Sequence, residues 1–412
     1  MRRRSIQVLA LSIAAACASC SKESSKDTPK RGADQASDPG QAKKPQTPPA
    51  GKAASAKLKA QVVNHYAEVV YATYSETLST ARTLQSSIDA LLADPSEASL
   101  NAARAAWKAA RVPYGQTEVF RFYGGPIDND KTGPEGRLNA WPMDEGYVDY
   151  VKGHAQAGII NDVSKHPTLD LELVKSANEK GAEENVSTGY HAIEFLLWGQ
   201  DMDPAGPGKR PATDYVAGVG NNDRRRTYLK LVTELLVSDL ERLVKAWAPG
   251  AQNYRAEFVG KDVDVALTHI LTGMGGLSGA ELAGERMFVA WDGQEQEDEQ
   301  SCFSDNTHVD IIENARGVQN VYLGRYGKVA GPGVKALVAE VNPELATRLE
   351  AALAASVDAA QKIPVPFDQA ILGDDSADGR VKVKATIDLL RAQTTVIAQV
   401  AKTMGMNINL AE

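Results

Sequence analysis

The residue types and spacing best suited to chemistry in this sequence are those of His191 and Glu194, three positions apart in the stretch 189–198. On a helix, this spacing puts the imidazole and the carboxylate side by side on one face. The other residues of the stretch are almost all apolar, so we expect a helix that is buried nearly all round. A buried imidazole beside a buried carboxylate is costly unless each has a partner. One possibility is that both side chains bind a metal ion. The other is that they form a hydrogen bond with each other, which serves only to stabilise the core.

Two ligands do not complete a zinc or iron site, because such sites use four to six donors. Glu118 is the first candidate for a third ligand, and Asp128 and Asp201 follow it. Each of these can instead be an exposed or helix-capping carboxylate. Arg121, which lies between two phenylalanines, is a candidate partner for a buried carboxylate or an anionic ligand, or a member of a structural ion pair.

The segment around residues 304–308 is a further candidate, because it joins short polar residues to a histidine. Residues 304–307 read Ser-Asp-Asn-Thr, and their simplest role is to cap a helix that begins near His308. Ser304 and His308 are also candidate ligand-binding residues if this turn reaches a cleft. The acidic run 294–299 before it is expected to be a solvated loop, with weak cation capture as the functional alternative.

Composition excludes several classes of function. The chain has 412 residues, 43% of them hydrophobic and 24% charged, with a formal net charge of -8, which is typical of a globular protein that does not bind nucleic acid. It holds three cysteines, too few for a thiolate metal cluster. The glycine-rich phosphate-binding patterns and the G-x-S-x-G motif of serine hydrolases are absent from the sequence.

The first twenty residues resemble a bacterial lipoprotein signal. Three arginines at 2–4 precede an apolar run at 6–16, which is too short to span a bilayer. Small residues then lead to Cys17 and Cys20, as in a lipobox, so we expect lipidation of Cys20, or alternatively of Cys17. Ser21 follows Cys20, which favours the outer membrane, facing the periplasm or the cell surface. The alternative is an ordinary cleaved signal peptide without lipid.

The rest of the chain predicts an all-α fold of two packed helical bundles. Residues 21–57 are rich in proline and polar residues and are expected to form a disordered linker. Apolar residues then recur at threes and fours, and no stretch shows sustained strand-like alternation. Pro249 and Gly250 mark the predicted boundary between bundles at 58–248 and 249–412. Helices are expected at 58–93, from Pro95 (capped by Asp94) through a kink at Pro113, from Asp144 to 151, and at 169–178, 189–198, 224–247, 263–290, 308–326, 333–341, 343–362 (capped by Asn342) and 380–404.

Glycines interrupt the predicted helix 263–290 at positions 273, 275, 276, 279 and 284. A glycine costs about 1 kcal/mol relative to alanine in a helix interior. Close packing of another element, or close approach of a ligand, would explain that cost.

Four stretches together resemble the imelysin-like family, also called peptidase family M75. The first is Gly189-x-His191-x-x-Glu194, which is similar to the family's G-x-H-x-x-E signature. The second runs from Trp107 through Arg121 to Asp128, and the third from Leu138 through Trp141 to Glu145. The fourth, from Glu299 to His308, is similar to the iron-regulated IrpA-like branch, although Gln300 stands where that branch has histidine. The resemblance covers roughly residues 58–410.

The resemblance implies a two-domain helical fold, an envelope lipoprotein, and a role linked to iron acquisition. It also adds Trp141 to the candidate ligand-binding residues. The metal expected at His191 and Glu194 is iron, with zinc as the alternative. A peptidase is less well supported, because H-E-x-x-H metallopeptidases need a second histidine one turn away, and this helix has none.

Three hypotheses of function remain open. The first is a lipid-anchored protein that binds iron or an iron complex, and the second is a zinc-dependent peptidase using the same pair. The third is a structural partner of an outer-membrane transporter, in which the polar pair serves only the core. The first hypothesis places His191 and Glu194 at the junction of the two bundles, with Arg121 and the 304–308 turn within reach. The alternative is that the motifs are separate packing features of two independent bundles.

Overall fold

A computed structural model describes residues 54–203 and 206–410, and nearly all of its regular structure is helical. The predicted signal segment, Cys17, Cys20 and most of the predicted linker lie outside these residues. Helix α1 begins at Ala56, two residues before the predicted start, with Ser55 as its N-cap. Among the described helices, none is both long enough and apolar enough to cross a membrane. The prediction of an all-α fold is confirmed.

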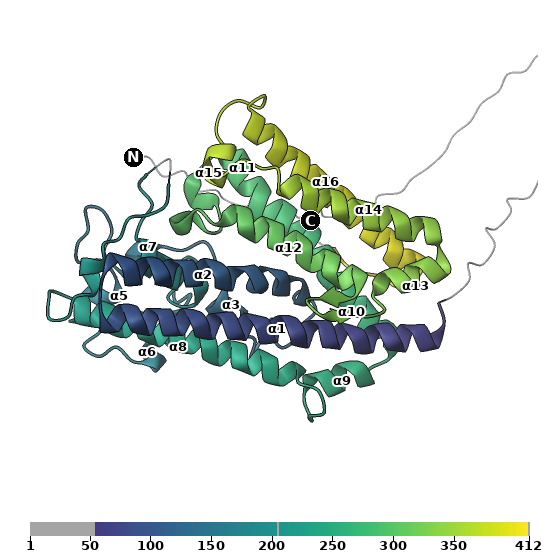
Figure 1. The fold of residues 1–412 in the computed structure, drawn as a ribbon, viewed down its shortest axis with the longest axis horizontal. Coiled ribbons are helices and arrows are strands. Elements are labelled where there is room, and N and C mark those ends of the chain that lie inside the picture. Colours follow the sequence, from purple (N-terminus) through teal and green to yellow (C-terminus); the bar gives the residue numbers. More distant parts are fainter. Residues whose placement is uncertain (1–53, 204–205, 411–412) are drawn as a thin grey trace, which may run out of the picture. The chain divides into compact units, whose positions relative to one another are not determined.

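Three long helices between residues 56 and 247, namely α1, α2 and α8, pack lengthwise, as Figure 1 shows. Helix α1 contacts both α2 and α8, and the short α7 contacts α2 and α8. The bounds of the three long helices and of the short α7 are α1 (Ala56–Ala93), α2 (Glu97–Thr117), α7 (Gly189–Trp198) and α8 (Asn222–Trp247). The segments between them hold η1 (Glu118–Phe120), α3 (Glu135–Leu138), α4 (Glu145–Val148), α5 (Gly158–Asn161), α6 (Leu171–Ala177), η2 (Ala212–Tyr215) and α9 (Tyr254–Gly260).

The helices from Val263 onward form a second group. In this group, α14 and the π-helical η3 both pack on α16. The two groups meet where α12 packs on α2 and α10 packs on α1. The elements are α10 (Val263–Gly276), η3 (Leu277–Phe288), α11 (Val289–Gly293), η4 (Gln296–Asp298), η5 (Cys302–Ser304), α12 (Thr307–Leu323), α13 (Val334–Val341), α14 (Pro343–Ala360), α15 (Phe367–Ala370) and α16 (Asp378–Thr403). A two-residue hairpin, β1 (Arg325–Tyr326) with β2 (Val329–Ala330), is the one sheet among the described residues.

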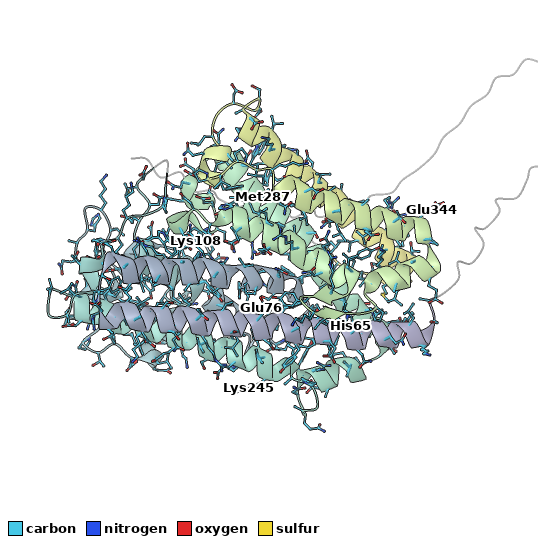
Figure 2. All side chains as sticks on the ribbon, viewed as in Figure 1. His65, Glu76, Lys108, Lys245, Met287 and Glu344 are labelled. Atoms are coloured by element: carbon cyan, nitrogen blue, oxygen red, sulfur yellow. The ribbon has the colours of Figure 1, made fainter. Side chains whose placement is uncertain are left out.

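The side chains separate by polarity, as expected for helices with one apolar face. Figure 2 shows Lys245 and Glu344 on the outer surface, where both are exposed, whereas Met287 is fully buried. The buried apolar residues from both helix groups belong to one continuous core. The core therefore runs across the junction of the two groups instead of dividing at Pro249.

Helix caps follow the predicted chemistry only in part. Asn306 lies at the N-cap of α12, within the predicted segment 304–307, but its side chain makes no capping hydrogen bond. Asp144 and Asn342 cap α4 and α14, as predicted. The prediction that Asp94 caps the second helix is wrong, because α2 begins at Glu97 with Ser96 as its N-cap. Ser96 and Ser99 exchange side-chain-to-backbone hydrogen bonds in a capping box, which satisfies two N–H groups at the helix start.

The glycines of α10 allow close approach to the segment that carries Glu118 and Arg121. A methyl group on Gly273 would collide with the backbone carbonyl oxygen of Val119, and one on Gly276 would lie 2.8 Å from Cγ of Phe122. Beyond α10, the helix continues as the π-helical η3, a wider geometry that is found often at functional sites. Close packing, which was one of the two predicted reasons for these glycines, is therefore confirmed.

We expect Gly273→Ala to destabilise the protein by about 1–3 kcal/mol, the usual cost of overpacking, in spite of alanine's better helix propensity. Urea unfolding monitored by circular dichroism measures this change. Gly284→Ala is the matched control, because its nearest neighbour would lie at 3.5 Å, an ordinary contact. Equal effects of the two substitutions would show that helix propensity, and not the contact with Val119, decides the result.

Candidate functional site

Helix α7 is held in place from both ends. Gly189 has a φ of +81°, and a side chain there would lie 2.6 Å from the carbonyl oxygen of Leu138 in α3. The indole of Trp107 on α2 donates a hydrogen bond to the carbonyl of Tyr190 at 2.9 Å. Gly199, also at positive φ, ends the helix. These contacts fix the orientation of the helix that carries the His-x-x-Glu pair.

His191 and Glu194 contact each other and are both 0% exposed. His191 Nδ1 lies 2.9 Å from Glu194 Oε2. The other carboxylate oxygen, Oε1, accepts hydrogen bonds from the backbone N–H of Ser304 at 3.0 Å and from its hydroxyl at 2.6 Å. The carboxyl group thus links α7 to the η5 turn, 110 residues later in the sequence. The predicted proximity of the 304–308 turn to the pair is confirmed.

Burial keeps this pair close to electrical neutrality. It lowers the pKa of His191 well below its ordinary value, and the positive charges of Arg111 and Arg286 lower it further. Burial also raises the pKa of Glu194 to about 8, although hydrogen bonds from Ser304 oppose the shift. The imidazole is therefore neutral at pH 7, which is the state in which histidine binds metals.

The second ring nitrogen, His191 Nε2, is buried and has no hydrogen-bond partner among the described residues. Trp141 packs against the same ring, with the ring centroids 5.0 Å apart, and its own indole N–H is also buried without a partner. Buried polar atoms in native proteins are nearly always satisfied. The imidazole and the indole that pack on each other therefore each carry a polar atom that can bind a water molecule or another group.

A buried ion pair lies behind the His-x-x-Glu pair. The guanidinium of Arg111 donates through Nε to Asp310 at 3.0 Å and through Nη1 to Asn139 at 2.5 Å. The hydroxyl of Ser301 donates to the other oxygen of Asp310 at 2.5 Å. The charge of Arg111 acts on both His191 and Glu194. Sequence reasoning missed Arg111 and Asp310 as individual residues, and the available signal was a charged residue on the apolar face of α2, four residues after Trp107.

Glu118 lies in a second buried network instead of completing the donor set of His191. Its Oε2 pairs with Arg286 and, at 2.8 Å, with Arg121. Glu281 pairs with both guanidinium groups as well, and Glu135 pairs with Arg121 at 3.1 Å. Burial by itself would raise the pKa of Glu118, but the charges of Arg286 and Arg121 outweigh it and lower the pKa to about 2. Glu118 is therefore a charged structural partner here, and Arg121 is internally paired.

A cavity of about 380 Å³ opens beside these networks, at the junction of the two helix groups. Trp141, Asn139 and Gln300 line it, so that it borders the residues around His191. Two guanidinium groups, of Arg121 and Arg286, face six carboxyl groups, a formal excess of four negative charges. The six carboxyl groups belong to Glu135, Glu179, Glu183, Glu281, Glu285 and Asp298. This balance suits a cation or a cationic complex better than a free anion.

The remaining predicted site residues lie elsewhere. Asp128 accepts a hydrogen bond from the backbone N–H of Phe122 at 2.5 Å and so supports the turn after η1. Asp201 belongs to a carboxylate cluster with Asp305. His308 lies half-buried in the first turn of α12, and its Nδ1 has no hydrogen-bond partner in the part of the chain that the structure describes. Among the described residues, the predicted candidates that contact the His-x-x-Glu pair directly are Trp141 and Ser304.

The donor set limits the chemistry of the pair. Among the described residues, a group of three acidic side chains converges closely enough to share a metal ion, but His191 does not belong to it. His191 and Glu194 thus offer at most two protein ligands. A metal at this position would take its other ligands from water or from a molecule bound with it.

The two buried glutamates should respond to pH in opposite directions. Glu194 has a folded-state pKa above its unfolded value of 4.5, so its contribution to stability is greatest below pH 4.5 and is lost as the pH rises toward 8. Glu118 has a lowered pKa, so its contribution is present above pH 4.5 and is lost as the pH falls toward 2. Relative to wild type, Glu194→Gln should therefore gain stability between pH 5 and pH 8.

Glu118→Gln provides the contrast in the same experiment. It should be on the order of 3 kcal/mol less stable than wild type at pH 7, since each pKa unit corresponds to about 1.4 kcal/mol, and this deficit should shrink as the pH falls toward 3. Urea unfolding at pH 3, 5, 7 and 8 measures both trends. A deficit of Glu118→Gln that grows on acidification would contradict the assignment of Glu118 as a charged partner of Arg286.

Comparisons with known proteins agree on one family and one fold. The imelysin family model matches residues 70–397. Iron-regulated protein A of Synechococcus elongatus is 26% identical over 344 residues, which cover 80% of this chain and 80% of that protein. The crystal structure of an iron-regulated protein A precursor from Parabacteroides distasonis has a TM-score of 0.66 at 21% identity, covering 85% of this chain and 96% of that one. An imelysin-like protein from Psychrobacter arcticum has a TM-score of 0.63 at 16% identity, covering 87% and 99%.

Proposed function

This chain belongs to the imelysin family, and from that premise we propose that it is a lipid-anchored protein of the bacterial cell envelope that binds iron or an iron complex during iron acquisition. The relative named for regulation by iron supports the link to iron. The binding site we propose centres on His191, whose ring contacts Glu194 on one side and Trp141 on another, and Trp141 also lines the nearby cavity.

The observation that carries this proposal is the unpartnered Nε2 of His191. Metal-ligating histidines commonly donate their other ring N–H to a carboxylate, which fixes the tautomer and makes the ring a better ligand. In this protein, Nδ1 faces the Glu194 carboxyl group, which Ser304 holds in turn. When Nδ1 donates to Glu194, the lone pair of Nε2 is available to a metal. The arrangement supports a role for Glu194 in orienting the ligand, while His191 supplies the donor.

The small number of protein donors favours a metal that arrives with ligands of its own. Iron accepts imidazole together with oxygen donors. His191 and Glu194 provide at most two ligands. The nearby cavity of about 380 Å³ would accommodate the rest of an iron complex, and Trp141 is the residue that contacts the ring of His191 and also lines this cavity. The excess of carboxyl groups on the cavity wall adds attraction for a cationic species.

The membrane anchor and the partner protein in this proposal are inferred from the sequence alone. A lipid on Cys20, or alternatively on Cys17, would tether the domain through the proline-rich segment that follows. Ser21 favours the outer membrane, where an iron transporter is the natural partner.

Metal binding by the purified protein tests the proposed function. Protein stripped with a chelator is titrated with Fe²⁺, ferric citrate and Zn²⁺, and the bound metal is measured by elemental analysis after desalting. We expect one iron per chain, and no chelator-sensitive hydrolysis when the loaded protein is incubated with a peptide library. Tight zinc with chelator-sensitive cleavage would instead establish a peptidase. Absence of any bound metal would leave the pair a core hydrogen bond.

A further inference from the structure

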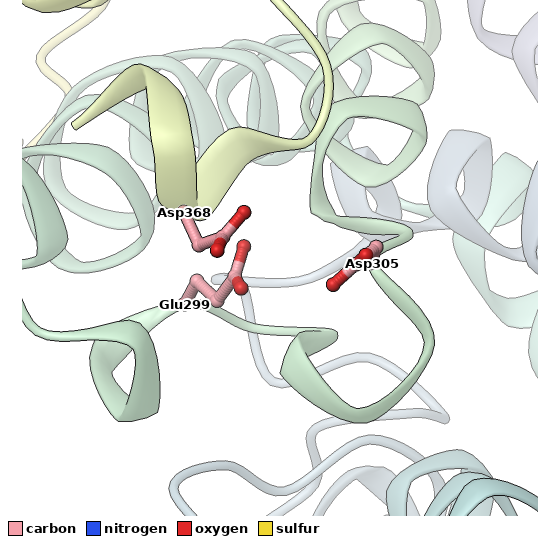
Figure 3. A group of neighbouring side chains, drawn as sticks. All are labelled: Glu299, Asp305 and Asp368. Atoms are coloured by element: carbon pink, nitrogen blue, oxygen red, sulfur yellow. The ribbon is translucent and has the colours of Figure 1, made fainter. Parts of the chain in front are cut away.

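A second group of metal-ligating side chains lies apart from His191. Glu299 and Asp305 flank the η5 turn, and Asp368 belongs to α15. One carboxylate oxygen from each of the three lies within 4.8 Å of the others. Figure 3 shows the carboxyl groups of Glu299 and Asp368 turned toward each other, with Asp305 facing them from across the gap.

Glu299 and Asp368 are buried, Asp305 is nearly so, and several of their carboxylate oxygens have no hydrogen-bond partner among the described residues. Glu299 is 0% exposed, and the hydroxyl of Thr307 lies near its carboxylate without completing a hydrogen bond to either oxygen. Oδ1 of Asp305 and Oδ1 of Asp368 are also buried and unpartnered, while the other oxygen of Asp368 accepts a hydrogen bond from Gln369 at 2.9 Å. Buried carboxylates with so few donors and counter-charges are strongly unfavourable. Here three of them converge on one point.

We propose that Glu299, Asp305 and Asp368 form a binding site for a hard divalent cation such as Ca²⁺, which ties the η5 turn to α15. Carboxylate oxygens are the ligands that such cations prefer, and three carboxylates offer up to six oxygens when they bind in bidentate fashion. Metals that prefer thiolate or imidazole ligands are disfavoured here, because the group contains neither cysteine nor histidine.

The electrostatics of the surroundings agree with a bound cation. Burial raises the pKa of Glu299 well above its ordinary value, and the charges of Asp368 and Asp305 add to this shift. The pKa of Asp305 is raised to about 7 by burial and by the charges of Asp201 and Asp368, while Lys108 opposes the rise. A divalent cation would remove this repulsion and allow the carboxyl groups to ionise.

A cation bound by Glu299, Asp305 and Asp368 would also affect the His-x-x-Glu pair, because the η5 turn lies between the two sites. Ser304, which holds Glu194, lies in the turn between Glu299 and Asp305. A cation that fixes both sides of this turn would also fix the hydrogen bonds that orient the His-x-x-Glu pair. The proposal does not depend on iron binding at His191, since the two donor sets share no residue.

Calorimetric titration of the full chain with CaCl₂, after removal of metals with a chelator and desalting, tests the site. We expect one Ca²⁺ per wild-type chain and at least a tenfold loss of affinity in Glu299→Gln and in Asp368→Asn. The control for the loss of one negative charge is Asp358→Asn, because Asp358 is an exposed carboxylate on α14. This variant should bind Ca²⁺ as tightly as wild type does. His191→Ala should also keep its Ca²⁺, which separates this site from the proposed iron site.

Thermal unfolding with and without Ca²⁺ provides the second readout. Ca²⁺ should raise the unfolding temperature of wild type but not that of Glu299→Gln, and without Ca²⁺ the variant should unfold at or above the wild-type temperature, because glutamine adds no charge to the cluster. If Glu299→Gln does not fold, Asp305→Asn replaces it, at the most exposed of the three positions. The proposal is overturned if wild type binds none of Ca²⁺, Mg²⁺ and Mn²⁺, or if Glu299→Gln and Asp368→Asn bind as tightly as wild type.

Discussion

Arg111→Ala is expected to lower the free energy of unfolding by about 3–5 kcal/mol, the cost of breaking a buried ion pair on one side. Arg111 and Asp310 are each 1% exposed, and the salt bridge between them joins α2 to α12 across the junction of the two helix groups. Without the guanidinium, Asp310 keeps the hydroxyl of Ser301 as its one side-chain donor among the described residues, and the Asn139 carbonyl oxygen also loses its partner. An uncompensated buried carboxylate accounts for most of the loss.

Chemical denaturation of Arg111→Ala, Asp310→Ala and the double variant measures this effect. The double variant should cost clearly less than the sum of the single changes, because it leaves no unpaired charge in the interior. Arg82→Ala is the matched control, since Arg82 pairs with Glu241 on the surface and such pairs contribute about 0–1 kcal/mol. If Arg111→Ala costs no more than Arg82→Ala, the buried pair does not hold the two helix groups together.

The helices of this protein were largely predictable from sequence because they depend on local patterns. The apolar periodicity of α1 and the buried character of α7 appear directly in the order of residues. The caps at Asp144 and Asn342 follow from the same kind of local chemistry. The cap before α2 was predicted at the wrong residue, because the prediction relied on Asp94 and Pro95 and did not recognise the capping box between Ser96 and Ser99.

The site was predictable only in part, because its partners come from distant parts of the chain. His191 and Glu194 are close in sequence, and their contact follows from helix geometry alone. Glu118 was predicted as a ligand because its partner Arg286, 168 residues away, cannot be recognised from the residues around Glu118. Arg111 and Asp310 are 199 residues apart. Which charged residues neutralise one another in the interior is set by the packing of whole helices, and a single sequence does not contain that information in readable form.

The acidic stretch before η5 illustrates the same limit. Its composition predicted a solvated loop, and Glu295 and Glu297 remain in contact with solvent. Glu299, at the end of the same run, is completely buried, because the chain there turns inward to place Ser301 on Asp310 and Ser304 on Glu194. The acidic stretch 294–299 thus contains exposed glutamates and one glutamate, Glu299, that is fully buried, and its composition does not distinguish them.

Glu194→Gln is expected to reduce the affinity for iron by about 10–100-fold, and His191→Ala by more, since the first change alters the orienting partner and the second removes the donor. The reason for the effect of Glu194→Gln lies in the hydrogen bonds of its carboxyl group. The backbone N–H of Ser304 requires an acceptor, so the amide oxygen of glutamine would take the place of Oε1. The amide NH₂ would then face Nδ1 of His191 and force that nitrogen to accept. The ring proton would move to Nε2, and the lone pair that a metal needs would be lost.

Titration of wild type and both variants with iron, combined with urea unfolding of the metal-free proteins at pH 7, tests this expectation. Glutamine closely matches glutamate in shape and carries no charge, whereas burial disfavours the charged carboxylate of Glu194, so metal-free Glu194→Gln should be at least as stable as wild type at pH 7. His154→Ala, which removes an exposed imidazole, should leave both iron binding and stability unchanged. Iron binding that survives unaltered in Glu194→Gln and His191→Ala would place the metal elsewhere and reduce the His-x-x-Glu pair to a packing feature. A large loss of metal-free stability in Glu194→Gln would lead to the same conclusion, because a pair kept for binding contributes little to the fold when no metal is present.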